Sequence, residues 1–214
     1  MRGASAVAAW HAVLALIIAA GCFLAGPSDS ARAAPAQEAR RTAQNAQVIL
    51  IKGLAGVFSS GMLDLGEKLR RRGIDARIES HADSDALLDD LVKRYKAGAR
   101  GPIIIMGHSL GADVAGGLAR RLNEHRIPVA LLVTFGPLSD PVVTPNVARA
   151  VNYYQSASAW RGQMMPAQGF RGSLTNVNLD SAGDINHFNI EKADRLHAET
   201  IAKVSAVLGR PQAR

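Results

Sequence analysis

The chain has 214 residues, of which 48% are hydrophobic and 20% are charged. This length suits one domain with a sizeable core, and this composition excludes a long disordered protein. The net charge is +7, but the basic residues occur in short groups, such as Arg70 to Arg72, at the ends of expected helices. Aromatic residues make up only 5% of the chain. We therefore expect no nucleic-acid binding, whereas a weak association with an anionic envelope surface stays open.

Residues 1–33 have the pattern of an export signal. One arginine is followed by an apolar run to Gly26, and Ala31-Arg32-Ala33 has the small-x-small form of a signal-peptidase site. We expect cleavage near Ala33 or Ala34 and a periplasmic or secreted protein. Two alternatives are an uncleaved membrane anchor, because the run is long enough to span a bilayer, and a lipoprotein modified on Cys22. Cys22 is the single cysteine, so a mature exported protein has no disulfide.

Residues 34–46 read as a polar lead-in to a domain that spans residues 47–214. Short apolar runs alternate there with helical patterns. We expect strands within 46–54, 74–80, 102–106, 127–135, 149–156 and 173–179. We expect helices within 59–73, 83–98, 110–125 and 189–208. Continuous aliphatic strands that alternate with amphipathic helices predict an α/β fold. Its six-stranded, mostly parallel sheet would be covered by helices on both faces.

The sequence Gly107-His108-Ser109-Leu110-Gly111 lies between an expected strand and an expected helix. In this setting the G-x-S-x-G pattern is typical of a nucleophilic serine at a sharp turn. The turn is so tight that side chains two positions before and two after the serine would collide, which favours glycine at both. The following helix begins at the serine, and its N–H groups can support negative charge there. The alternative is a glycine-rich turn whose serine only caps the helix.

From these residues, and from GHSLGA in particular, the chain resembles the α/β-hydrolase superfamily, over most of residues 47–209. Small secreted bacterial lipases, esterases and thioesterases are the most similar members. The resemblance implies a three-layer fold, and the short segment from Phe135 to Asn146 leaves no room for a large lid. It also implies that Ser109 is the nucleophile, that His187 is the general base, and that a carboxylate orients the histidine. His187 follows the last strand, where this superfamily carries its base.

The carboxylate is the hardest residue to assign. The loop after the strand at 149–156 has no acidic residue where the superfamily usually places one. Asp140, followed by Pro141, fits a variant in which the acid follows the preceding strand, although its loop must then fold back. Asp184 and Asp180 are rivals because both lie close to His187 in the sequence. We favour Asp140.

Two backbone N–H groups complete the expected site. That of Leu110 directly follows the nucleophile, and that of Leu54 follows the first strand, so together they would form an oxyanion hole. The segment 156–172 carries Trp160, Met164, Met165 and Phe170, which either form an acyl pocket or pack over the sheet edge.

The sequence contains no metal-ligand cluster and no cofactor motif, so we expect neither a metal nor a cofactor. It predicts a serine hydrolase that cleaves small acyl esters or thioesters by way of an acyl-enzyme. Two alternatives are a non-catalytic envelope binding protein and an acyltransferase. The natural acyl chain and the oligomeric state are not determined by the sequence.

Overall fold

The structure is a computed structural model that describes residues 37, 42, 45–54, 60–156 and 162–210. The expected export signal at 1–33 and nearly all of the lead-in at 34–46 lie outside these residues, so both stay predictions. Within the described part of the chain, none of the helices combines the length and the apolar character needed to cross a membrane.

Six parallel strands form the central sheet, as the sequence predicted. They are β1 (Gln47–Lys52), β2 (Ala76–Ser80), β3 (Ile103–His108), β4 (Leu131–Phe135), β6 (Arg149–Tyr154) and β8 (Ser173–Asn178). Their order across the sheet is β2-β1-β3-β4-β6-β8. Ile104 of β3 pairs with Val48 on one side and Leu131 on the other, which places β3 inside the sheet. All five pairings are parallel, so the carboxyl ends of the strands meet at one edge.

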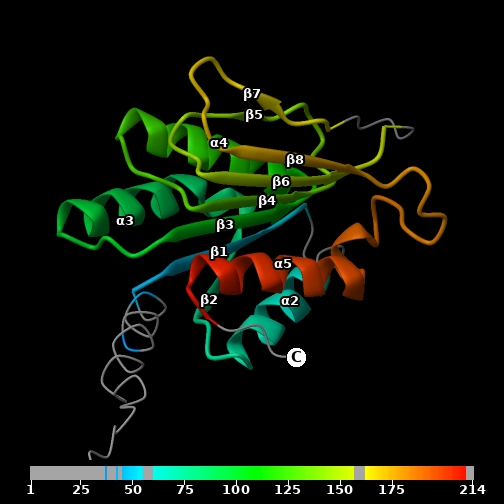
Figure 1. The fold of residues 1–214 in the computed structure, drawn as a ribbon, viewed down its shortest axis with the longest axis horizontal. Helices are drawn as coiled ribbons and strands as arrows, with labels where there is room; N and C mark the ends of the chain where they lie inside the picture. The colour runs from blue at the N-terminus through cyan, green and yellow to red at the C-terminus, as the bar shows by residue number, and fades with distance from the viewer. Residues whose placement is uncertain (1–36, 38–41, 43–44, 55–59, 157–161, 211–214) are drawn as a thin grey trace, which may run out of the picture.

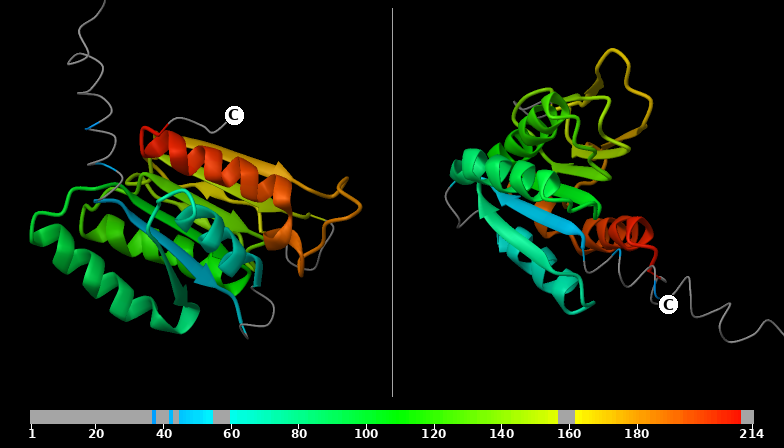
Figure 2. Two further views of the ribbon diagram at one scale, coloured as in Figure 1. Left: turned by 90° about the horizontal axis from the view of Figure 1, so that it is seen from below. Right: turned by 90° about the vertical axis from the view of Figure 1, so that its left-hand side faces the viewer.

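Four helices cover the two faces of this sheet (Figures 1 and 2). They are α2 (Ser60–Arg70), α3 (Ser84–Lys96), α4 (Leu110–Glu124) and α5 (Asp194–Val207). The helices α2 and α5 share one apolar cluster with the sheet, and α3 and α4 share the other. Two short 3-10 helices, η2 (His81–Asp83) and η3 (Ile190–Lys192), precede α3 and α5.

The alternation of side chains along β1 shows why this inner strand is a continuous apolar run. Val48 and Leu50 pack into the cluster under α2 and α5, while Ile49 and Ile51 pack into the cluster under α3 and α4. Successive side chains of a strand point to opposite faces, and both faces are covered here. The four side chains are at most 1% exposed, which confirms the buried parallel sheet.

Two local features differ from the expectation. The sequence did not predict β5 (Val142–Val143) and β7 (Met165–Pro166), which form a small parallel pair of their own. The closing helix expected at 189–208 is interrupted, because Ala193 has an extended backbone with ψ of 114° between η3 and α5. Before this break, Glu191 lies against the start of α2, where its atoms leave no room for a Cβ on Gly61.

Candidate active site

Ser109 occupies the turn between β3 and α4. The strand ends at His108 and the helix begins at Leu110, so the turn consists of the serine itself. Its φ of 56° and ψ of −127° lie in a region that non-glycine residues rarely adopt. Such backbone strain persists only where the surrounding structure imposes it, and it is common at active sites. The turn therefore holds the serine side chain out from the carboxyl edge of the sheet.

The two flanking glycines are required by close backbone contacts. A Cβ on Gly107 would lie 2.1 Å from the carbonyl oxygen of Gly111. A Cβ on Gly111 would lie 2.4 Å from the carbonyl oxygen of Ile51, at the end of β1. A Cβ atom does not approach a non-bonded oxygen so closely, so both positions exclude every side chain. The collision expected from the sequence involves the backbone of the turn and of β1.

The structure brings Ser109 and His187 together. The hydroxyl of Ser109 lies 3.0 Å from Nε2 of His187, within hydrogen-bond distance. His187 lies between β8 and η3, in a segment whose neighbours Ile185 and Ile190 are buried in the core. The aromatic ring of Phe188 packs edge-on against the imidazole, at 5.5 Å between centroids. The loop is thus tied to the core on both sides of the histidine.

The environment of His187 favours its neutral form. Burial lowers the pKa of His187, and the negative charge of Asp113 partly opposes this by raising it. A neutral imidazole with an unprotonated Nε2 can accept a proton from the Ser109 hydroxyl. This arrangement is one in which a serine could act as a nucleophile and the histidine as its general base.

His108 also contributes to this site, a role that the sequence analysis did not foresee. Its Nε2 lies 3.0 Å from the backbone carbonyl oxygen of His187 and donates a hydrogen bond to it. The side chain is 1% exposed, and burial lowers the pKa of His108 to about 4, so the ring is neutral. The residue directly before Ser109 thereby holds the backbone of His187. The position of His108 directly before Ser109 was the one sequence feature that could have pointed to this role.

The three carboxylates considered from the sequence make the following contacts. Asp140 accepts a hydrogen bond from the backbone N–H of Gln163 at 3.0 Å. Asp180 accepts hydrogen bonds from the Ser156 hydroxyl and from the side-chain amide of Asn178. The carboxylate of Asp184 is 85% exposed and lies 4.0 Å from Arg195. The role of Asp140 as the orienting carboxylate stays a prediction.

Asp113, in the first turn of α4, was not considered as a candidate. Its carboxylate accepts hydrogen bonds from the backbone N–H groups of Leu138 and Ser139, both at 3.1 Å. It also accepts one from the Ser139 hydroxyl at 2.7 Å. These bonds fix the segment that follows β4. The sequence feature that could have pointed to Asp113 is its position as an acidic residue one helical turn after Ser109.

The two expected oxyanion donors lie at the carboxyl ends of adjacent strands. Leu110 is the first residue of α4, and the first N–H groups of a helix have no partner within it. Leu54 lies two residues after β1, which pairs with β3, and its side chain is 65% exposed. Residues 55–59, which continue this loop, lie outside the described residues. The oxyanion hole stays a prediction.

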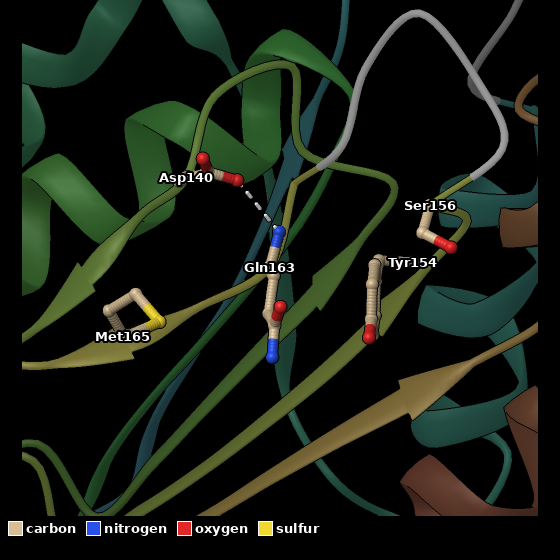
Figure 3. A pocket seen from close by; sticks show the side chains of 5 residues that line it. All are labelled: Asp140, Tyr154, Ser156, Gln163 and Met165. Carbon is tan, nitrogen blue, oxygen red and sulfur yellow. Dashed lines mark hydrogen bonds between the residues drawn. The ribbon is translucent and has the colours of Figure 1, made fainter.

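A pocket of about 470 Å³ lies at the carboxyl end of β6 (Figure 3). Asp140, Tyr154, Ser156, Gln163 and Met165 line it, and Figure 3 shows the hydrogen bond between Asp140 and Gln163. Ser109 follows β3 and Tyr154 ends β6, so the pocket and the nucleophile share one edge of the sheet.

The described residues of the segment 156–172 differ in burial, and its role as an acyl pocket stays a prediction. Met165 is 52% exposed and lines the pocket, whereas Met164 is fully buried in the core. Phe170 packs against the same cluster. Trp160 lies outside the described residues.

A separate polar cluster joins α2 to α5. Asp64, Asp194 and His197 present ligand atoms within 4.8 Å of one another, an arrangement that could hold a metal ion. The Lys68 ammonium lies 2.6 Å from each carboxylate and 3.0 Å from Nδ1 of His197. The lysine supplies the positive charge of this cluster, which therefore joins the two helices as an ion-pair network.

No protein-family model and no curated protein sequence matches the chain. Among solved structures, a thioesterase from the prodiginine biosynthetic pathway of Streptomyces coelicolor is 12% identical, with a TM-score of 0.45. That match covers 74% of this chain and 85% of the other. The type II thioesterase of the borrelidin biosynthetic cluster is 14% identical over 76% and 92% of the two chains, with a TM-score of 0.44. Human thioesterase 2 is 11% identical over 76% and 97%, with a TM-score of 0.41.

The fold class follows from the features of the chain itself. These are a parallel sheet in the order β2-β1-β3-β4-β6-β8, a strand–serine–helix turn after β3, and a histidine that follows the last strand and meets the serine. With helices on both faces of that sheet, the chain has the α/β-hydrolase fold that its sequence predicted.

Proposed function

We propose that the protein is a serine hydrolase that cleaves carboxylic esters or thioesters through an acyl-enzyme on Ser109. The contact of 3.0 Å between the Ser109 hydroxyl and Nε2 of His187 carries this proposal. A serine that only capped α4 would turn its hydroxyl toward the N–H groups of that helix. Here the side chain makes no capping hydrogen bond, and its hydroxyl meets an imidazole from a distant part of the chain.

The reaction has two halves. Ser109 Oγ attacks the acyl carbon while His187 takes the hydroxyl proton, and the resulting oxyanion is held by the N–H groups of Leu110 and Leu54. The tetrahedral intermediate then expels an alkoxide or a thiolate, which takes the proton from His187 and leaves the acyl group on Ser109. In the second half, water attacks the acyl-enzyme and gives its proton to His187. The acid departs, and the proton returns to Ser109.

An orienting carboxylate stabilises the imidazolium that forms in both halves of the reaction. Asp140 is our proposal from the sequence for this role. The turn around Asp140 lies at the same edge of the sheet as the pair, which makes the assignment open to a direct test. A substitution of Asp140 tests this role separately from substitutions of Ser109 and His187.

We propose a neutral acyl group with apolar character as the substrate. Leu54 is 65% exposed and Phe188 is 55% exposed, and they lie beside the two halves of the site. Leu54 carries an expected oxyanion donor, and Phe188 contacts the imidazole of the base. Apolar side chains in such positions favour uncharged acyl chains over charged ones.

A fluorophosphonate probe tests the proposal, because it reacts covalently with an activated serine. The native protein is expected to be labelled and to hydrolyse p-nitrophenyl acetate, butyrate or a longer ester, whereas Ser109→Ala is expected to do neither. Ser173→Ala is a matched control, because it removes another serine hydroxyl, at the start of β8 and outside the residues that line the pocket. Absence of labelling of the folded native protein would contradict the proposal and favour the non-catalytic envelope protein. Transfer to an added alcohol in preference to water would favour the acyltransferase.

A further inference from the structure

We propose that Asp113 is a positioning residue for the Ser109–His187 pair, which fixes the segment after β4 against the imidazole and supplies it with negative charge. This inference rests on the proposed function. It assigns a role to a carboxylate that the resemblance to the α/β-hydrolase superfamily did not point to. Two independent relationships in the structure support it, one geometric and one electrostatic.

The geometric relationship runs through the segment 136–139. The Asp113 carboxylate accepts three hydrogen bonds from Leu138 and Ser139, which hold this segment to the first turn of α4. At the other end of the segment, Gly136 lies against the His187 ring. A Cβ on Gly136 would be 3.1 Å from Nδ1 of that ring.

Gly136 itself has a φ of 54°, and its N–H donates to the carbonyl oxygen of Tyr153 in β6. The backbone behind the imidazole is therefore fixed by β6 at one end and by Asp113 at the other. A shift of this backbone would change the space open to the His187 ring. Catalysis is sensitive to such shifts, because misplacement by about 1 Å can cost on the order of 100-fold in rate.

The electrostatic relationship concerns the charge on His187. Burial disfavours the imidazolium, and the negative charge of Asp113 favours it. The imidazolium forms each time His187 takes a proton, so a nearby anion stabilises the charge that develops during the reaction. Among the described residues, His108 of β3 also faces the ring, with the two ring centroids 5.6 Å apart, and its low pKa keeps it neutral. Lys192 of η3 contributes positive charge in the same region.

The first turn of α4 is also a suitable place for a hydrogen-bond acceptor. Asp113 lies in this turn, where the helix dipole stabilises an anion. Its carboxylate accepts hydrogen bonds from Leu138 and Ser139 and so holds the segment 136–139 to α4.

The test compares pH–rate profiles of the native protein, Asp113→Asn and Ser139→Ala on a p-nitrophenyl ester. Asp113→Asn removes the charge and keeps one acceptor oxygen. We expect kcat to fall on the order of tenfold, with little change in KM. The acid limb of kcat/KM is expected to move to lower pH, because the charge that raises the pKa of His187 is lost. Ser139→Ala removes one hydrogen bond and no charge, so we expect it to leave the position of the acid limb unchanged.

Asp85→Asn is the matched control for the loss of one negative charge. Asp85 lies on the neighbouring helix α3 and pairs with Arg121 of α4, with 85% of its side chain exposed. If the acid limb of kcat/KM lies at the same pH in Asp113→Asn as in the native protein, the inference is overturned. A shift in Asp140→Asn that is absent from Asp113→Asn would overturn it as well, and would assign the role to Asp140.

A second measurement does not depend on turnover. NMR titration of the His187 ring in Ser109→Ala, with and without Asp113→Asn, is expected to show a lower pKa when the carboxylate is removed. An unchanged pKa would overturn the inference. If the folded native protein is not labelled by a fluorophosphonate, the proposed function fails. If it is labelled while Asp113→Asn keeps its native rate and profile, only the inference on Asp113 fails.

Discussion

His187 Nε2 lies 3.0 Å from the hydroxyl of Ser109, and the two residues are separated by 78 positions in the chain. The sheet makes this possible, because the serine follows β3 and the histidine follows β8, whose carboxyl ends point to the same edge. The serine keeps this position at the expense of an unfavourable backbone conformation, with φ at 56°. Ser109 is thus both the residue with the strained backbone and the proposed nucleophile.

Substitution of Ser109 separates strain from catalysis. Ser109→Ala and Ser109→Gly are both expected to abolish fluorophosphonate labelling, because neither has a nucleophile. Glycine adopts positive φ at little cost, whereas alanine does not. The glycine variant is therefore expected to be more stable than the alanine variant by about 1 kcal/mol, as measured by urea denaturation. Equal stabilities would show that the turn stores no strain.

The glycines of the turn give a second prediction. Gly107→Ala and Gly111→Ala each force a Cβ to within 2.4 Å or less of a backbone oxygen, so each is expected to destabilise the protein by more than about 3 kcal/mol or to prevent folding. Gly117→Ala is the matched control on α4, because a Cβ there meets nothing within 4 Å. Helix propensity favours alanine, so this variant is expected to gain about 0.5–1 kcal/mol. Tolerance of alanine at Gly107 would contradict the close contact.

Those features of this site that have a local sequence pattern could be predicted, whereas contacts between residues far apart in the chain could not. The turn at Ser109 was predicted because it has a local pattern of glycines, and the contact of His187 with it was predicted because His187 follows the last strand. Asp113 and His108 were missed, because their contacts join segments far apart in the chain: Asp113 bonds to residues 25 and 26 positions away, and His108 to one 79 positions away. No local pattern encodes such pairings.

The same distinction holds for the fold. Each strand of the sheet was predicted: β1, β3 and β4 are largely continuous apolar runs, and β2 alternates between polar and apolar residues. The break at Ala193 was not, because the periodicity of the closing segment continues through it. The tertiary contact of Glu191 with Gly61 at the start of α2 accompanies that break. The short pair of β5 and β7 was also missed, because two-residue strands carry no periodicity.

The activity is expected to fall on the acid side at a pH below 6.5. Catalysis needs neutral His187, and burial holds the pKa of that residue below its usual value of 6.5. The rate therefore rises as pH increases through this lowered pKa and then stays level. A profile of kcat/KM against pH, recorded between pH 4 and pH 9, checks this expectation. An acid limb centred above pH 7 would contradict it.

His108 is expected to make stability depend on pH. Burial lowers its pKa from 6.5 to about 4, so between these values the unfolded chain binds a proton that the folded chain does not. The free energy of unfolding then falls as pH decreases from 6.5 to 4, by about 3 kcal/mol for this residue. In His108→Gln this dependence is removed, while a side-chain N–H that can donate to His187 is retained. Urea denaturation at pH 4.5 and 6.5 measures the difference between the two proteins.

Two outcomes separate the roles of His108. His108→Leu removes the donor, and its kcat is expected to fall below that of His108→Gln, because the backbone of His187 loses its hydrogen bond. Equal kcat values in the two variants would contradict a positioning role for this bond. The same acid sensitivity in the native protein and His108→Gln would contradict the lowered pKa.

Glu191 is expected to have the opposite effect on stability. Its side chain is fully buried, and within the part of the chain that the structure describes its carboxylate oxygens have no hydrogen bond of good geometry. Burial raises the pKa of Glu191 from 4.5 to about 7, while the N–H groups of Gly61 and Met62 partly offset this effect. Between these pH values the folded chain holds a proton that the unfolded chain has lost. The free energy of unfolding therefore falls as pH rises from 4.5 to 7.

Glu191→Gln tests this account, because glutamine is close in shape and does not ionise. Relative to the native protein, the variant is expected to gain about 2–3 kcal/mol of stability between pH 5 and pH 8. Glu67→Gln on α2 is the matched control, because that exposed carboxylate pairs with Arg70 at the surface and its loss should change stability little. Because His108 acts in the opposite direction, the native protein alone would show a shallow pH dependence that conceals both groups. A parallel response of the native protein and Glu191→Gln from pH 5 to pH 8 would mean that the buried carboxyl keeps its ordinary pKa.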